Sequence, residues 1–296
     1  MSTIFLRLNG LPSPEPVRVP LLERCIARAG ESRLDPDWRS GAFALVAAPG
    51  ARQPGVAAAA LCAAQGASDA PAVFMATPVH CEAGMVSVRL PLDGIVRLEP
   101  AAAARLAADF NAEFATSGAR LLAGAQGQLY CLLAHSAAVP THDPLQVCGR
   151  DIGEYLPQGA AGAPLRRLMA EIEMWLHGRE AAPITGLWLW GGGESGGSLP
   201  ALAGWTAGDD PLFGAWPKSA RLPAQPGNGV VVVDAEPGRE AWTVAQETWL
   251  RPAVAGLRRG RFTALLLSIG ERRYRLGRWD LLRVWRRSRP WWESLA

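Results

Sequence analysis

The sequence has few charged residues and no apolar run long enough to cross a membrane. Charged side chains make up 19% of the 296 residues, and hydrophobic side chains make up 49%. That balance excludes an intrinsically disordered chain and supplies enough apolar surface for one large domain or two modest ones. Residues 1–16 also lack the basic start and the long apolar stretch of a signal peptide. We therefore expect a cytoplasmic protein without a membrane partner.

Cysteine and histidine lack the spacings that metal sites use. The five cysteines are scattered and form no C-x-x-C pair, so we expect free thiols in a reducing compartment. The four histidines form neither an H-x-x-x-H nor an H-E-x-x-H pattern. These absences predict no bound metal and no cofactor.

Lysine is almost absent, because Lys218 is the only one and arginine supplies the other 29 of the 30 basic residues. The arginines gather near the C-terminus, where residues 257–290 hold eleven of them against Glu271 and Asp280, a surplus of nine positive charges. Arg283, Arg286 and Arg287 in this segment are candidate contacts for nucleic acid or for an acidic protein partner.

The same segment has a plainer interpretation as a solvated amphipathic helix over residues 279–288. In that helix Leu281, Leu282 and Trp285 would face inward and the arginines outward. Aromatic side chains among arginines are also able to stack on bases. At the chain end, Trp291 and Trp292 would mark a partner site if they were exposed.

Apolar strands that alternate with helices predict an α/β fold with a mostly buried mixed sheet flanked by helices. The expected strands and hairpins cover 3–8, 72–91, 119–134, 186–190, 229–236, 261–270 and 272–278. The expected helices cover 21–29, 99–118, 163–178, 238–260 and 279–288, and residues 55–67 form a helix or an alanine-rich turn. We expect a kink or a break near Pro252 in the helix over 238–260, and we expect residues 82–84 to form the turn within 72–91.

A glycine-rich loop expected at residues 153–163 is the expected boundary between two parts of the chain. It divides an N-terminal α/β region, residues 1–160, from a C-terminal α/β region, residues 161–296. One continuous domain is the alternative.

The most unusual stretch is GLWLWGGGESGGSLP, residues 186–200. Gly191, Gly196 and Ser198 have the spacing of a phosphate-binding P-loop, but Gly197 stands where that loop needs a lysine. The following Leu-Pro is a poor start for the helix that a P-loop requires. We therefore interpret the glycines as a tight structural turn after a buried strand.

The strand before these glycines carries two tryptophans. Strand geometry places Trp188 and Trp190 on one face and Leu189 on the other. The candidate binding residues of this stretch are Trp188, Trp190, Gly191, Gly192 and Gly193.

Four isolated residues are candidates for catalysis. His80 follows a predicted strand, His177 ends a predicted helix, and Asp234 follows four valines at a strand end, where α/β proteins bind ligands. Ser195 has the outer glycines of a nucleophile elbow without its strand-to-helix context. Structural interpretations compete: a helix end favours a cation at His177, and Asp234 suits a cap or turn.

Five segments carry a resemblance to a known family: TPVHCEAGMVSVRL, AEIEMWLH, GLWLWGGG, VVVVDAE and LLRVWRR, at 77–90, 170–177, 186–193, 230–236 and 281–287. In order and spacing they resemble the proteobacterial RpfE-type regulatory proteins, often labelled phosphoglycerate mutase-like. Thr185-Gly186 stands where that family has Asn-Ser.

The segment LWLWGGGESGGSLPAL, residues 187–202, is similar to one in the archaeal-type cofactor-independent phosphoglycerate mutases of the alkaline phosphatase superfamily. The resemblance implies their scaffold; their chemistry needs a Ser or Thr nucleophile and two metals held by Asp and His. Here Asn9-Gly10 stands where the superfamily has Asp-Gly, and the neighbouring pair His142-Asp143 is in reverse order. We expect the scaffold to be shared and the reaction not to be.

These observations favour a regulatory or interaction protein without metal-dependent phosphomutase activity. One alternative is a divergent metal-dependent phosphomutase or phosphatase that uses His80, His177, Asp234 and Ser195. The other is a nucleic-acid-associated protein that uses the arginine-rich C-terminus.

Overall fold

The computed structural model describes residues 2–9, 17–66, 70–134, 139–179, 184–194, 198–224, 227–234 and 239–294. Contacts divide the chain into two compact units. The first unit joins Met1–Gln53 to Pro200–Ala296, and the second unit is Pro54–Leu199. This division differs from the expected boundary near residue 160, because strand β9 (Gly186–Glu194) pairs with strand β3 (Ala72–Val79). A boundary at 160 would separate these two paired strands.

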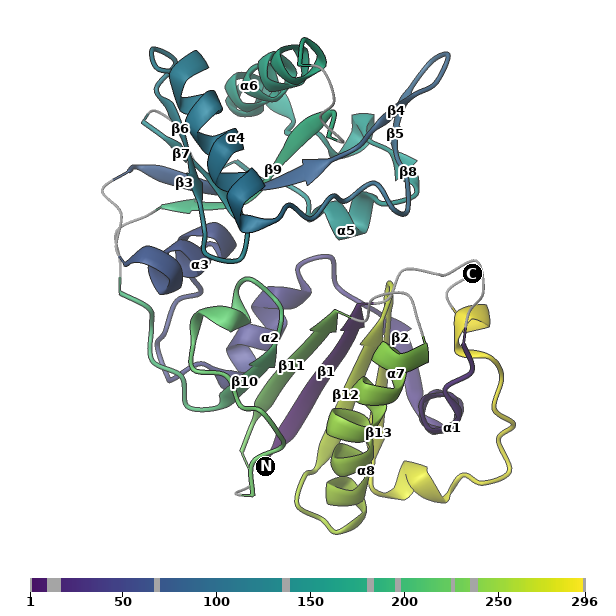
Figure 1. Cartoon of the computed structure of the whole chain (residues 1–296). Helices are drawn as coiled ribbons and strands as arrows, with labels where there is room; N and C mark the ends of the chain where they lie inside the picture. The colour runs from purple at the N-terminus through teal and green to yellow at the C-terminus, as the bar shows by residue number, and fades with distance from the viewer. Residues whose placement is uncertain are drawn as a thin grey trace. The chain divides into compact units, whose positions relative to one another are not determined.

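The first unit is built on one six-stranded sheet (Figure 1). Its strands, in spatial order β10-β11-β1-β12-β13-β2, are Trp205–Gly208, Gly229–Asp234, Thr3–Asn9, Ala264–Ile269, Arg272–Gly277 and Gly30–Arg33. The first four are parallel, whereas β13 and β2 run antiparallel to their neighbours. The sheet is therefore mixed, and β1 lies inside it because its sequence is apolar at nearly every position.

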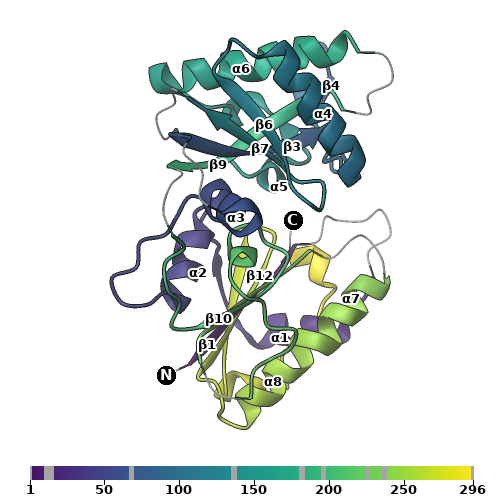
Figure 2. The same cartoon turned by 60° about the vertical axis from the view of Figure 1, so that its left-hand side comes forward.

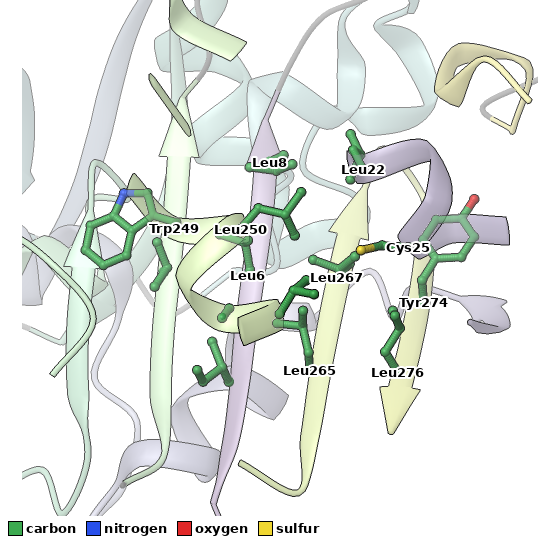
Figure 3. Close-up of a cluster of buried hydrophobic side chains, with 14 of the residues drawn as sticks. Leu6, Leu8, Leu22, Cys25, Trp249, Leu250, Leu265, Leu267, Tyr274 and Leu276 are labelled. Carbon is green, nitrogen blue, oxygen red and sulfur yellow. The ribbon is translucent and has the colours of Figure 1, made fainter. Parts of the chain in front are cut away.

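Helices cover both faces of this sheet. Helix α1 (Pro20–Arg28), α7 (Arg239–Ala245) and α8 (Arg251–Arg258) lie on one side, and α2 (Trp38–Val46) lies on the other (Figure 2). On the α1 side, Leu6 and Leu8 of β1 join Leu265 and Leu267 of β12 in one buried cluster (Figure 3). Because side chains alternate along a strand, β1 packs against the helices on both faces of the sheet.

The helix expected over residues 238–260 is interrupted near Pro252, as predicted. Proline has no N–H and cannot donate to the carbonyl one helical turn earlier. A π-helical turn, Gln246–Leu250, comes directly before α8, which then begins with Pro252 in its first turn.

The second unit contains an antiparallel sheet in the order β6-β7-β3-β9, with β6 at Ala119–Ala123 and β7 at Leu129–Leu133. Helices α4 (Pro100–Glu113) and α6 (Gly159–His177) share a buried cluster with its strands, and α3 (Val56–Gln65) contacts β3 and β9. A second, small sheet has the order β4-β5-β8, at Glu82–Ala83, Val88–Leu90 and Arg150–Asp151. The short helix α5 (Pro144–Val147) and the 3₁₀ turn η1 (Gly153–Tyr155) complete the unit.

The predicted α/β class, with a mixed sheet flanked by helices, is confirmed. Two local predictions are wrong. Residues 82–83 belong to strand β4, and the hairpin turn follows them, closed by the Gly84 N–H donating to the Ser87 carbonyl. Residues 279–288 do not form the expected helix, since only Trp279–Leu282 form a 3₁₀ turn, η4. Of the three side chains predicted to face inward, only Leu281 is buried. In the described part of the chain, no helix has the length and apolar character to span a bilayer.

Residues 278–294 contain two short 3₁₀ turns and no longer helix or strand, and this segment, here called the C-terminal strap, contacts helix α1 through both turns. At its far end, in the 3₁₀ turn η5 (Trp291–Ser294), Trp291 is 2% exposed and its ring packs on Trp242 with centroids 4.7 Å apart. Its indole N–H donates to the Val17 carbonyl over 2.9 Å. Trp291 is therefore docked, and Trp292 is partly buried against the same core.

The middle of the strap caps the carboxyl end of α1. Arg283 donates to the carbonyl of Arg28, and Arg286 donates to the carbonyls of Ala27 and Ala29. The last carbonyls of a helix have no partner inside the helix, and arginine side chains are suited to satisfy them. The strap thus holds α1 at both of its ends.

We predict that Trp291→Ala destabilises the first unit by about 3–5 kcal/mol, because it removes a buried indole and its hydrogen bond. Urea unfolding of the full chain measures the loss. Trp285→Ala is the matched control, since Trp285 is 73% exposed, and its effect should stay within about 0.5 kcal/mol. Equal losses for the two variants would contradict the docking of Trp291.

Candidate functional site

His80, His177 and Asp234, three of the four candidate catalytic residues, lie at the ends of three different elements of the described chain. His80 and His177 are exposed in the second unit, at the end of β3 and at the end of α6. Asp234 ends β11 of the first unit, in register with Asn9, and only its backbone is described. Ser195 lies outside the described residues. Among the described residues, no group of three or more His, Cys, Asp or Glu side chains is arranged to hold a metal ion.

The carboxyl ends of the parallel strands carry a buried charge network that sequence reasoning missed. Arg39 pairs with Asp210 over 2.9 Å, and Arg7 donates to the Ser268 hydroxyl over 2.8 Å. The ring of Trp38 lies 4.7 Å from the Arg7 guanidinium and 4.6 Å from that of Arg39. An arginine inside the otherwise apolar strand TIFLRLN was the available signal, because a buried charge requires partners. The network joins β1, α2 and β12 and supports the fold.

The tryptophans of β9 are buried and satisfied. The indole N–H of Trp188 donates to the His142 carbonyl, and that of Trp190 donates to the Thr77 hydroxyl, each over 2.8 Å. Leu189 belongs to the core under α4 and α6, whereas neither tryptophan does. The predicted alternation of faces is therefore confirmed.

Three of the glycines are in the strand and not in a turn, which corrects the sequence-based interpretation. Strand β9 continues through Gly191, Gly192 and Gly193. A Cβ atom on Gly192 would lie 2.2 Å from the Phe74 ring, and one on Gly193 would lie 2.7 Å from the Gly55 Cα. Close packing against β3 and the start of α3 thus explains the glycines without a ligand.

Two of the three candidate arginines of the C-terminus already have acceptors within the protein. Arg283 and Arg286 cap α1, and Arg283 also pairs with Asp280 over 2.9 Å. Arg287 is exposed. The binding capacity of this region therefore depends mainly on other arginines.

Those arginines line an open groove of about 510 Å³ between α1, α8 and the start of the strap. We call it the arginine groove. Its lining residues are Leu21, Arg24, Cys25, Arg28, Val254, Arg258, Arg278, Trp279, Leu281, Leu282 and Val284.

The helical period explains how the groove arises from the sequence. Leu21, Arg24, Cys25 and Arg28 are spaced i, i+3, i+4 and i+7, which places them on one face of α1. Val254 and Arg258 have the same i, i+4 relation on α8. The signal in the sequence was the mixed apolar and basic face of α1. The other walls of the groove come from segments more than 200 residues further along the chain.

The groove is positively charged and apolar at once. In the described part of the chain, none of its four guanidinium groups is paired with a carboxylate. Arg28 donates to the Leu281 carbonyl, Arg24 donates to the Pro20 carbonyl, and Arg278 lies over the ring of Trp279. A ligand with negative charges would find unneutralised partners here.

The lining residues offer binding contacts and no acid–base pair. They comprise arginine, aliphatic side chains, one tryptophan and one thiol. Burial raises the pKa of the Cys25 thiol to about 12, although Arg28, Arg24 and Arg258 oppose that rise. A thiol with so high a pKa stays protonated at neutral pH and is a poor nucleophile.

No family model matches the chain, and no curated protein matches it. Among solved structures, the cofactor-independent phosphoglycerate mutase from Thermoplasma acidophilum DSM 1728 is 13% identical, with a TM-score of 0.34. That match covers 94% of this chain and 90% of the other. No residue role is transferred from that enzyme, and the resemblance to RpfE-type proteins stays a prediction.

We predict that Gly192→Ala destabilises the second unit by about 1–3 kcal/mol, because the new Cβ would clash with Phe74. Gly178→Ala is the control in the same unit, since its Cβ would meet ordinary contacts at 3.6 Å or more and its φ is −75°. Thermal melting of both variants measures the difference. A harmless Gly192→Ala would show that the strand has room for a side chain.

We predict that the free energy of unfolding falls as pH rises above about 9. The pKa of buried Cys25 and Cys131 is raised to about 12 from an ordinary value of 9.0. Below pH 9 both thiols are protonated in the folded and unfolded chains, so their contribution is constant. Above it the unfolded chain releases protons that the folded chain keeps, which costs up to about 1.4 kcal/mol per thiol per pH unit.

Urea unfolding between pH 8 and pH 10.5 measures that slope. Cys25→Ala should make the slope of the free energy of unfolding against pH shallower by the contribution of one thiol. An unchanged slope would show that Cys25 ionises equally in both states.

Proposed function

We propose that this chain is a regulatory or interaction protein that binds an acidic segment of a protein partner in the arginine groove. A cytoplasmic location fits the buried thiols of Cys25, Cys131 and Cys148. A regulatory role is also what the resemblance to the RpfE-type proteins implies.

One observation carries the proposal. Arg24, Arg28, Arg258 and Arg278 converge on a single groove, and none of them is paired with a carboxylate in the described part of the chain. Four like charges at close range repel one another, and an acidic ligand relieves that repulsion. Guanidinium groups also form two-pronged hydrogen bonds with carboxylates, which lysine cannot do.

The composition of the groove supports binding over catalysis. Neither a carboxylate, nor a histidine, nor a hydroxyl side chain is among the described residues that line it. General acid–base and nucleophilic mechanisms each need such a group within hydrogen-bonding reach of the substrate. The divergent phosphomutase and the nucleic-acid-associated protein therefore stand as alternatives that the experiment below must separate from the proposal.

We predict that charge reversal in the groove weakens binding of an acidic peptide. The probe is a fluorescein-labelled synthetic 16-residue peptide of glutamate and leucine, followed by fluorescence anisotropy. Arg24→Glu and Arg278→Glu should each weaken binding roughly tenfold, because each replaces attraction by repulsion at about 1.4 kcal/mol.

Arg275→Glu is the matched control, with the same change in net charge. Arg275 alternates with Tyr274 and Leu276 along β13, and those two side chains face the α1 side of the sheet. Arg275 therefore faces away from the groove, and its reversal should change affinity less than about twofold. An equal loss of peptide affinity in Arg275→Glu would show that the effect comes from net charge and not from the groove. Tighter binding of a single-stranded oligonucleotide, with the same mutational pattern, would favour the nucleic-acid alternative.

A further inference from the structure

The rim of the arginine groove carries an exposed apolar surface that charge attraction does not explain. Trp279, Leu282, Val284 and Trp285, here called the apolar ridge, are 75%, 60%, 70% and 73% exposed. Nine large hydrophobic side chains are exposed in the described part of the chain, and four of them lie within the seven residues 279–285. Such clustering marks an interaction surface, whereas single exposed apolar residues do not.

The ridge is held in place by the residues between its members. Leu281 is buried beneath it, and its carbonyl accepts a hydrogen bond from Arg28 over 3.0 Å. Asp280 accepts from the Gly277 N–H over 2.7 Å and pairs with Arg283. Anchors on both sides keep the apolar side chains displayed, so little ordering would be needed on binding.

We propose, on the basis of the function proposed above, that the partner segment is amphipathic and carries large apolar side chains next to its acidic ones. Three ridge residues, Trp279, Leu282 and Val284, also line the groove. One apolar side chain of the partner would therefore contact the apolar ridge and the aliphatic lining of the groove, while neighbouring carboxylates contact the arginines. A groove of about 510 Å³ has room for one or two large side chains of the partner segment.

The same features argue against other polyanions. Nucleic-acid bases can stack on Trp279 and Trp285, but Leu21, Val254 and Leu281 offer no hydrogen-bonding partner to the polar edges of bases. An anionic bilayer would suit the ridge, yet the recess between α1 and α8 would go unused. An acidic peptide with apolar anchors uses the charges, the ridge and the recess together.

The test compares two labelled peptides of equal length and equal glutamate content, one with leucine and phenylalanine and one with serine in their places. The folded full chain should bind the apolar peptide at least tenfold more tightly than the serine peptide. Trp279→Ala and Leu282→Ser should each reduce that affinity ratio to a value between about one and about three. Val244→Ser removes another exposed apolar side chain, on α7, and should leave the ratio unchanged.

The outcomes separate the two proposals. If both peptides bind equally and Trp279→Ala has no effect, while Arg24→Glu still weakens binding, the groove binds acids and the apolar inference is wrong. If neither peptide binds, the proposed function and this inference fall together. If phosphatidylglycerol vesicles or an oligonucleotide bind through Trp279 and the peptides do not, the ridge serves a membrane or a nucleic acid and the inference is overturned.

Discussion

The attachment of the C-terminal strap to helix α1 is the constraint on which the groove depends. Two of the three walls of the groove are α1 and the start of the strap, and they are joined by hydrogen bonds in both directions. Arg28 donates to the strap at Leu281, and Arg283 donates back to Arg28. Trp291 fixes the far end of the strap on Val17, ahead of α1. Without these contacts the groove would lose a wall, and the apolar ridge would lose its fixed geometry.

The arginine-rich end of the chain thus contains two classes of arginine that composition cannot separate. Arg283 and Arg286 satisfy carbonyls at a helix end, which is a structural role. Arg278 and Arg258 are unpaired with carboxylates in the described part of the chain and border the groove. Arginine suits both roles because its planar group donates in several directions at once. A net charge therefore says less about binding than the list of acceptors around each guanidinium does.

Much of the fold was predictable from local patterns. The apolar runs at β1, β11 and β12, the helical face of α4 and the interruption of the α-helix just before Pro252 all follow from periodicity and from proline chemistry. The alternation of Trp188 and Leu189 followed from strand geometry. Each of these features depends on residues close together in sequence.

The candidate site was not predictable in the same way. The face of α1 that carries Arg24 and Arg28 was visible as a helical pattern, but Arg258 and Arg278 join it only through the tertiary fold. The inward placement of Leu282 and Trp285 was wrong because the segment forms only the short 3₁₀ turn η4 and not the longer helix that would turn both side chains to the core. Gly192 looked like part of a turn because the close approach of Phe74 cannot be read from neighbours in sequence. Long-range contacts decide all three cases.

The order of the chain through the two units has a consequence for biosynthesis. The second unit is one uninterrupted stretch, whereas the first unit needs β1 from the beginning of the chain and β10 to β13 from its last hundred residues. During translation the second unit has all of its strands before the first unit has its central parallel pairs. Strand β1 is therefore synthesised well before β11 and β12, the two strands with which it pairs in the folded unit. The nascent chain thus carries an unpaired apolar segment until β11 and β12 have followed, and the groove is completed only after its last lining residue, Val284, has been synthesised.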